Sequence, residues 1–473
     1  MELTHVDIEP KPLDGLTQIL DRSFLDGFTI QMRETASRLD GRKVWNINST
    51  VEGGGVAEML GALLPYWADL GWDIRWTVMF GDDDFFEVTK RIHNALHGAS
   101  LTNGGLDEDA RRVYASTTAA NADAIKGVVS PGDVALIHDP QAAGLIAPLL
   151  EHGVHVSWQC HIGTDDPNDN TRAAWDFLRS YVSDADRYVF TRERHMWDGL
   201  EASRLRIIPP SIDALSAKNM SLTEDEVTNI LRTAHFLAGD PSRAAQFRCQ
   251  DGRTGTVERP VDRVGGELRL PRSARIVLQV SRWDRLKDPI GCIRILAEHL
   301  SDIDDLHLVH AGPSTAEVDD DPEGAEVLAE CAELWKSLPA ELQERVHLIS
   351  VPMDDVEENA VIVNALQRYA DVVLQKSLQE GFGLTVSEAM WKQKPVVASR
   401  VGGIQDQIED GKSGILVDEP ADLAAFAREI RKVLSDDAMA LNLGKEGYRR
   451  VCDHFLGPRQ LLQYADLVDE LVT

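Results

Sequence analysis

Two cations and one carboxylate follow buried-strand patterns in the second half of the chain. Arg282 and Lys287 come after the apolar run 276–280, and Glu380 lies in a Glu-Gly-Phe-Gly loop after the run 372–375. Guanidinium and ammonium groups bind phosphate oxygens. A carboxylate in a glycine-flanked loop can accept hydrogen bonds from sugar hydroxyls. These residue types predict a site for a phosphorylated sugar at the ends of strands.

The cations also have a purely structural interpretation. Arg282 or Arg285 could pair with Asp284 in a solvated loop, and spacing alone weighs this equally with phosphate binding. Asp288 and Pro289 have the types expected of a helix N-cap and first helical residue. The cations therefore belong to the loop between a strand and a helix.

Backbone N–H groups beside Glu380 are a further candidate for phosphate binding, because a helix is predicted to begin there. They belong to Gly381, Phe382, Gly383 and Leu384. A second carboxylate, Glu388, stands three residues after Thr385, in the pattern of a capping box. That pattern explains Glu388 without any ligand, but it does not account for Glu380.

A run of glycines follows the apolar segment 44–48 in the first half. Gly53, Gly54 and Gly55 precede a segment with apolar residues at helical spacing. Glycines at a strand-to-helix turn let N–H groups approach an anion. A tight turn that needs positive φ explains them as well, and the run matches neither the G-x-G-x-x-G nor the P-loop pattern. Taken alone, these glycines favour anion binding and a tight turn about equally.

The elements that position these residues form two series. Short apolar runs alternate with helical patterns, as expected for parallel strands joined by helices. The first series comprises 44–48, 74–80, 134–138, 154–158 and 188–190; the second comprises 276–280, 306–310, 346–350, 372–375, 396–398 and 415–417. Between them the chain is polar from about Asp213 to Arg272, with one helix expected after Thr223 and Glu226. This pattern predicts two doubly wound α/β domains with ligands at the strand carboxyl ends between them.

Composition excludes several classes of function. The chain has 473 residues, 43% apolar, and a formal net charge of −30. Such an acidic surface disfavours nucleic acid and anionic membranes as partners. The five cysteines form no C-x-x-C pair, no apolar run approaches a membrane span, and the N-terminus has no basic, apolar leader pattern. We therefore expect a soluble cytoplasmic protein without a metal site.

The spacing Glu380-x7-Glu388, preceded by Arg282-x4-Lys287, resembles the retaining glycosyltransferases of the GT-B fold, in glycosyltransferase family 4. This resemblance implies two Rossmann-like domains facing a cleft, with a C-terminal helix that crosses back to the first domain. It also implies that Arg282 and Lys287 neutralise donor phosphates and that Glu380 orients the transferred sugar. Glu388 would hold the ribose hydroxyls of a nucleotide.

Further segments resemble the trehalose glycosyltransferring synthases and the related retaining trehalose phosphorylases. They are 46–60, 89–98, 138–141, 208–213, 321–324 and 381–391. The likeness fails between about 235 and 272, which looks like an insertion. The expected domains are 1–213 for the acceptor, joined by a helix at about 453–473, then a connector and insertion at 214–271, and 272–452 for the nucleotide sugar.

The same resemblance gives meaning to residues in the first domain. His161 matches a cleft histidine that faces the sugar ring in such enzymes. Asp139, which follows the run 134–138, can hold acceptor hydroxyls or serve as an N-cap. His93 and His97 share a helix face, and without a third ligand we interpret them as packing or acceptor-site residues.

The hypothesis from the sequence is a retaining enzyme that makes α,α-trehalose from a nucleotide-diphosphate glucose, such as UDP-glucose or ADP-glucose, and free glucose. No cofactor is expected, and the partners are small sugars and sugar nucleotides, with a homodimer as the oligomer considered. Alternatives are a phosphorylase that uses glucose 1-phosphate, a transferase with another acceptor, and a silent sugar-nucleotide binder.

Overall fold

The computed structural model describes all residues except 1, 52–54, 102–104, 251, 267–268 and 316–321. Its internal contacts divide the chain into two compact units. The first comprises Met1–Ser211 and Phe455–Thr473, and the second comprises Ile212–His454. Among the described residues, no helix is both long and apolar enough to cross a membrane.

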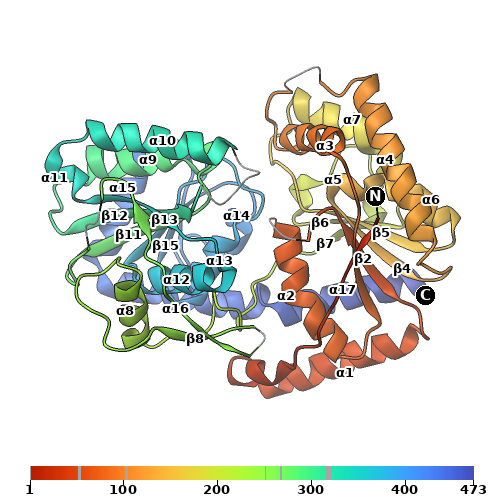
Figure 1. The fold of residues 1–473 in the computed structure, drawn as a ribbon, viewed down its shortest axis with the longest axis horizontal. Helices are drawn as coiled ribbons and strands as arrows, with labels where there is room; N and C mark the ends of the chain where they lie inside the picture. The colour runs from red at the N-terminus through yellow and green to blue at the C-terminus, as the bar shows by residue number, and fades with distance from the viewer. Residues whose placement is uncertain (1, 52–54, 102–104, 251, 267–268, 316–321) are drawn as a thin grey trace. The chain divides into compact units, whose positions relative to one another are not determined.

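The first unit is built on a seven-stranded sheet with the order β1-β3-β2-β4-β5-β6-β7 (Figure 1). The strands are β1 (Thr4–Val6), β2 (Val44–Asn48), β3 (Ile74–Val78), β4 (Val134–His138), β5 (His155–Cys160), β6 (Arg187–Phe190) and β7 (Leu205–Ile207). Only β1 pairs antiparallel, with β3. All five runs predicted in this half form strands, and β2 and β4 are buried along their whole length. Burial on both faces explains why residues 134–137 of β4 are apolar without alternation.

Helices of the first unit lie in two groups. They are α1 (Arg22–Arg38), α2 (Gly55–Asp69), α3 (Asp83–Leu96), α4 (Glu108–Lys126), α5 (Asp139–Ala142), α6 (Ile146–Glu151), α7 (Asp169–Val182) and α17 (Gly457–Val472). One group, α3, α4 and α7, packs together over an apolar core that includes Phe85, Tyr114 and Phe177. The other group joins α1, α2 and α17.

The C-terminal helix crosses back to the first unit, as predicted. It begins at Gly457 rather than Asp453, because α16 (Asp437–His454) continues through that residue. Leu461 is fully buried, and the ring of Tyr464 lies 5.7 Å from that of Trp67 on α2. Apolar burial therefore anchors the helix there.

The second unit has its own seven-stranded sheet, in the order β10-β13-β12-β11-β14-β15-β16. The strands are β10 (Asp262–Arg263), β11 (Arg275–Val280), β12 (Leu306–Pro313), β13 (Val346–Val351), β14 (Val372–Gln375), β15 (Val396–Ser399) and β16 (Ile415–Val417). The helices are α8 (Glu224–Thr233), α9 (Pro289–Arg294), α10 (Pro322–Ser337), α11 (Ala340–Gln343), α12 (Val356–Tyr369), α13 (Leu384–Trp391), α14 (Ile404–Gln407), α15 (Leu423–Ser435) and α16. All six predicted runs form its parallel strands, so the prediction of two doubly wound sheets is confirmed.

The segment 214–271 belongs to the second unit, which corrects its description as a separate connector and insertion. Its helix α8 starts at the predicted Thr223 and Glu226 capping box and packs on α12. The segment also forms a hairpin of β8 (Gln246–Arg248) and β9 (Thr254–Thr256) and supplies the edge strand β10. Its polar composition suggested a connector, but hydrogen bonds to distant residues hold the segment to the unit: the Asn364 side-chain amide donates to the carbonyls of Ala217 and Met220.

Candidate active site

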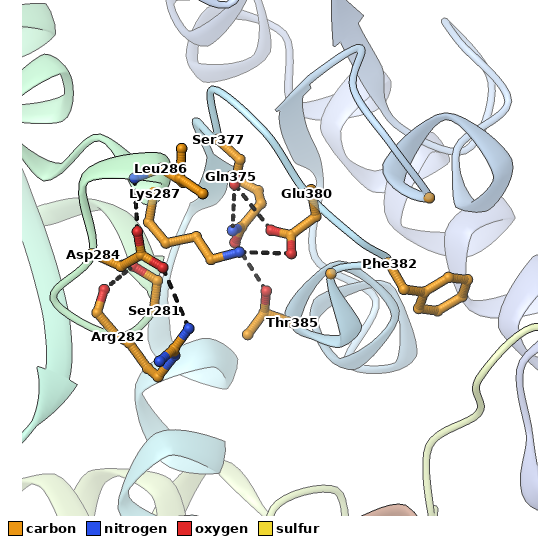
Figure 2. Close-up of polar contacts among 12 residues, drawn as sticks. Ser281, Arg282, Asp284, Leu286, Lys287, Gln375, Ser377, Glu380, Phe382 and Thr385 are labelled. Carbon is orange, nitrogen blue, oxygen red and sulfur yellow. Dashed lines mark hydrogen bonds and ion pairs between the residues drawn. The ribbon is translucent and has the colours of Figure 1, made fainter. Parts of the chain in front are cut away.

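Lys287 and Glu380 lie in contact although they are far apart in the sequence. Lys287 Nζ donates to Glu380 Oε1 at 2.6 Å, and Ser377 Oγ donates to Glu380 Oε2 at 3.0 Å (Figure 2). The side chains of Lys287 and Glu380 are only 16% and 9% exposed. Parallel strands β11 and β14 are neighbours, so the loops at their carboxyl ends meet. The fold thus brings together the cation and the carboxylate that the sequence singled out.

The loop after β11 is fixed by its own hydrogen bonds. Asp284 Oδ1 accepts from the backbone N–H of Leu286 at 2.7 Å, and Gln279 Nε2 donates to the carbonyl of Lys287 at 2.7 Å. Arg282 pairs with Asp284 at 3.3 Å, but its side chain is 65% exposed. The structural pair considered from the sequence therefore forms, and an exposed pair of this kind contributes little stability. A phosphate could therefore replace Asp284 as the partner of Arg282 with little loss of folding free energy.

The helix start after Lys287 is also confirmed. Asp288 is the N-cap of α9, its carboxylate accepts from the N–H of Gly291 at 2.9 Å, and Pro289 is the first helical residue. Asp288 adopts a left-handed conformation with φ of 45°, which is unusual without a glycine. Lys376, which has no exposed side-chain surface, donates to the Asp288 carboxylate. This buried contact ties the end of β14 to the residue that follows Lys287.

The loop 381–383 enters α13 through Gly383, whose φ of 82° favours glycine. Gln407 Nε2 donates to the carbonyls of Phe382 at 2.5 Å and Gly383 at 3.2 Å. The N–H of Gly403 donates to the carbonyl of Gly381 at 2.9 Å. The first helical residue is Leu384, so the N–H groups at this end of α13 are placed at the helix start, as predicted.

Glu388 has a different role from the capping box considered for it. The N-cap is Gly383, and Thr385 lies inside the helix with its hydroxyl donating to Gln375 Oε1 at 2.9 Å, so the capping interpretation is wrong. The Glu388 side chain is 4% exposed and pairs with Lys218 through Oε1 at 3.3 Å. Its Oε2 is buried without a hydrogen-bond partner among the described residues. A buried carboxylate oxygen in this state can accept a ligand hydroxyl.

Lys392 lies one turn after Glu388 and is fully buried. Its Nζ donates to Asn219 Oδ1 at 2.9 Å and to the Glu388 carbonyl at 3.1 Å. Burial lowers the pKa of Lys392 to about 7, although the charge of Glu388 acts in the opposite direction. This lysine therefore titrates near neutral pH beside a candidate ligand-binding carboxylate.

The first unit carries a second cluster at the carboxyl ends of β4 and β5. His161 Nε2 lies 3.1 Å from His138 Nδ1, and His138 Nε2 lies 3.1 Å from Asn46 Oδ1. Asp139 accepts from the backbone N–H of His161 at 2.8 Å and has a φ of 61°. The N-cap of α5 is His138, so the N-cap interpretation of Asp139 is wrong. Burial lowers the pKa of both histidines, which keeps the imidazoles neutral at pH 7.

The sequence analysis did not single out His138 or Asn46 as members of this cluster. His138 is the last residue of β4, and Asn46 is the middle residue of β2, so a polar side chain in a buried strand was the available signal. Their hydrogen bonds fix the ring of His161. Together with Asp139 they form a preorganised polar group at one sheet edge.

Another buried ion pair in the first unit was also missed. Arg192 Nη1 lies 2.9 Å from the Asp165 carboxylate, and His195 Nε2 lies 3.5 Å from Asp165. A side chain at Gly163 would collide with the His195 ring, so the glycine makes room for it. These residues follow β5 and β6, but no short motif joins them in the sequence.

The remaining predicted positions are less informative. His93 lies on α3 and His97 is the C-cap of that helix, with ring centroids 4.9 Å apart. In the described part of the chain, no group of three or more histidine, cysteine or acidic residues is arranged to hold a metal ion. Gly53 and Gly54 lie outside the described residues, and Gly55 is the exposed first residue of α2.

Structural comparison identifies the fold. The chain is similar to a structure titled as Escherichia coli trehalose-6-phosphate with UDP-2-fluoro glucose, at a TM-score of 0.67 and 14% identity, over 91% of this chain and 99% of that one. It is also similar to sucrose-phosphate synthase of Thermosynechococcus elongatus, at a TM-score of 0.62 and 19% identity, with coverages of 91% and 99%. Residues 265–450 match the family model "Glycosyl transferases group 1". The protein is therefore a glycosyltransferase with the GT-B fold.

Sequence relatives narrow this class. Residues 46–196 match the model "Trehalose synthase, N-terminal domain". The trehalose synthase of Rubrobacter xylanophilus is 38% identical over 91% of each chain, and that of Thermococcus litoralis is 35% identical over 99% of each. The chain belongs to the trehalose synthase family. A trehalose phosphorylase of Grifola frondosa is more distant, at 25% identity, and this chain spans 54% of its length.

Proposed function

We propose that the protein transfers glucose from a nucleotide-diphosphate glucose to the anomeric hydroxyl of free glucose and forms α,α-trehalose with retention. The observation that carries this proposal is the contact of Lys287 with Glu380 at the carboxyl ends of neighbouring strands. It joins a phosphate-binding cation to a sugar-binding carboxylate. The trehalose synthases that match most of the chain support the same product.

The donor diphosphate would bind the cations of the second unit. Arg282 and Lys287 neutralise phosphate charge, and the N–H groups at Gly383 and Leu384 add the positive end of a helix. Glu388 Oε2 would accept a ribose hydroxyl, because this buried oxygen has no hydrogen-bond partner among the described residues. The nucleotide sugar is a substrate, and the proposed reaction needs no cofactor.

The chemistry is mainly electrostatic. As the bond from sugar to phosphate breaks, the ring gains positive charge and the phosphate gains negative charge. Lys287 stabilises the departing phosphate from a position that Glu380 holds before the reaction, and the exposed Arg282 adds its charge. Glu380 holds the transferred sugar through its hydroxyls, since its two oxygens are oriented by Lys287 and Ser377.

Retention would follow from attack on the face that the phosphate leaves. A retaining glycosidase needs two carboxyl groups about 5 Å apart, and the loop of Glu380 carries no second acid. The departing phosphate oxygen would instead take the proton from the acceptor hydroxyl. The acceptor's hydroxyl oxygen forms the new bond to the anomeric carbon of the donor sugar as the bond from that carbon to the phosphate oxygen breaks. The nucleoside diphosphate leaves with the proton.

The acceptor glucose would bind the first unit. His161 is neutral at pH 7 and its ring is held by His138, so it can exchange hydrogen bonds with sugar hydroxyls without adding charge. Asp139 supplies a carboxylate at the same strand end. In this proposal His93, on α3, also contacts the acceptor sugar. Cytoplasmic location and a homodimer remain expectations from the sequence.

A product assay by NMR tests the proposal. The protein is incubated with glucose and, separately, UDP-glucose, ADP-glucose, GDP-glucose or glucose 1-phosphate. We expect trehalose together with a nucleoside diphosphate, and the productive donor identifies the base. Trehalose and inorganic phosphate from glucose 1-phosphate alone would instead establish a phosphorylase. Absence of trehalose with every donor would refute the proposed acceptor.

A further inference from the structure

A pocket of about 200 Å³ lies within the second unit, between the segment 235–270 and strand β13. Its lining includes Phe236, Val261, Arg263, His347 and Ile349. None of its lining residues takes part in the proposed donor site. His347 is the second residue of β13, whereas Lys287 and Glu380 follow the carboxyl ends of β11 and β14. The pocket is therefore a separate feature of this unit.

Backbone hydrogen bonds build the walls of the pocket. Arg263 pairs with Ile349 in the antiparallel ladder of β10 and β13. The N–H of Val261 donates to the carbonyl of Ala234 at 3.0 Å, and the N–H of Leu270 donates to the carbonyl of Phe236 at 2.9 Å. The segment is thus bound both to itself and to the sheet, so the pocket exists without a ligand.

Basic side chains gather at this pocket in a protein of formal charge −30. Arg263 and His347 line it, and His235 stands at its edge. On the neighbouring strand β12, His307 Nδ1 lies 2.9 Å from His347 Nε2, and the two ring centroids are 5.2 Å apart. Burial is the main cause that lowers the pKa of both rings; the charges of Arg345 and then Arg263 add to it for His307, and that of Arg263 adds to it for His347. Both rings are therefore neutral at pH 7, so the Arg263 guanidinium supplies the positive charge that would attract an anion.

The other lining groups limit the size and chemistry of the ligand. A single water needs a cavity of about 10–15 Å³ on the same measure, so a volume of about 200 Å³ has room for a small molecule. The Asp262 carboxylate can accept hydrogen bonds from hydroxyls, and Phe236 and Val261 provide an apolar wall. A planar guanidinium matches two phosphate oxygens.

We propose that this pocket binds a phosphate monoester, with Arg263 and His347 holding the phosphate and Asp262 facing the hydroxyls of an attached sugar. The ligand class is either a phosphorylated monosaccharide or, if only the anion is recognised, free phosphate. Occupancy would tie the segment 235–270 more firmly to β13. Binding in this pocket would not require the loops that carry Lys287 and Glu380.

Hydrogen–deuterium exchange of the full-length protein tests the site without any substitution. The probes are inorganic phosphate, glucose 6-phosphate and glucose, each at millimolar concentration, with sulfate as a control for ionic strength. We expect glucose 6-phosphate to slow exchange in 260–264 and 346–350. Equal protection by inorganic phosphate would identify the free anion as sufficient. The proposal would be overturned if glucose protected these residues and the two phosphate compounds did not, or if protection were confined to 375–391.

Calorimetric titration of variants tests the role of Arg263. Arg263→Gln should weaken glucose 6-phosphate binding at least tenfold, whereas Arg263→Lys should lose less because it keeps the charge. Arg248→Gln is the matched control, since Arg248 is exposed on β8 in the same segment, and its affinity should stay within twofold of the wild type. Unchanged binding by a folded Arg263→Gln variant would overturn the assignment. If that variant does not fold, the exchange experiment on the unaltered chain still decides.

Discussion

Replacement of Lys287 by methionine separates the catalytic role of its ion pair from its structural role. Lys287→Met keeps the length and apolar stem of the side chain but removes the charge. Of the side-chain contacts that the described residues make with the Glu380 carboxylate, the hydrogen bond from Ser377 at 3.0 Å then remains. Both the departing phosphate and Glu380 lose a cation, so catalysis and stability should each fall.

The structure allows the loss in kcat and the loss in folding free energy to be estimated. Loss of one preorganised group that stabilises developing charge costs about 2.7–4 kcal/mol in the barrier, or about 100- to 1,000-fold in kcat. Loss of a hydrogen bond between charged groups costs about 1.5–3 kcal/mol of folding free energy. Glu380 is 9% exposed, so water replaces little of the lost contact and the upper part of that range applies.

A second variant distinguishes these effects. In Lys287→Met/Glu380→Gln a neutral carboxamide replaces the carboxylate, so most of the lost stability should return while activity stays at or below that of the single variant. Lys336→Met is the control, because Lys336 pairs with Glu333 on the surface, where the two side chains are 61% and 73% exposed. Its stability should change by less than about 0.5 kcal/mol.

The assay combines initial rates of trehalose formation with urea unfolding followed by circular dichroism. The reasoning is refuted if Lys287→Met keeps kcat within tenfold of the wild type. It is equally refuted if the double variant recovers activity together with stability, because the lysine would then serve only to neutralise Glu380.

Three further perturbations address other parts of the structure. Glu388→Gln should raise the KM for the nucleotide sugar about tenfold with a smaller change in kcat, since it weakens an acceptor of charge-assisted hydrogen bonds; an unchanged KM would show that Glu388 does not contact the donor. Lys392 has a folded-state pKa of about 7, below its unfolded value of 10.5, so its burial opposes folding fully below pH 7 and less as the pH rises to about 10. The wild type should therefore gain up to about 4 kcal/mol between pH 7 and 10 relative to Lys392→Met, measured from urea midpoints, and parallel pH profiles would contradict this. Leu461→Ala, at a fully buried position of α17, should cost about 2–5 kcal/mol by urea unfolding, and a loss below 1 kcal/mol would mean that the helix is not anchored by this side chain.

Local patterns predicted much of the fold. Eleven apolar runs were assigned to strands, and all eleven form strands of the two parallel sheets. The helix starts at Thr223 and Asp288 were also read correctly from short-range cap chemistry. These features depend on residues near one another in the sequence, which is why the sequence reports them.

The errors came from interactions over long sequence separations. Thr385 and Glu388 have the spacing of a capping box, but Gln375 binds the Thr385 hydroxyl and Lys218 pairs with Glu388. The polar segment 214–271 looked like a connector because its partners, such as Asn364, lie about a hundred residues away or more. The pairing of Lys287 with Glu380 needed the adjacency of β11 and β14, which only the topology provides.

Packing between residues distant in the sequence also limits which substitutions the Glu380 loop can tolerate. A side chain on Gly402 would overlap the carbonyl oxygen of Glu380, and the φ of 48° at Gly402 disfavours other residues. Gly402 has no side chain that could contact a sugar. A library of random variants selected for activity should nevertheless be depleted of substitutions at this position. Evolution of a new donor or acceptor preference would therefore proceed through side chains around the Glu380 loop, while its backbone path stays the same.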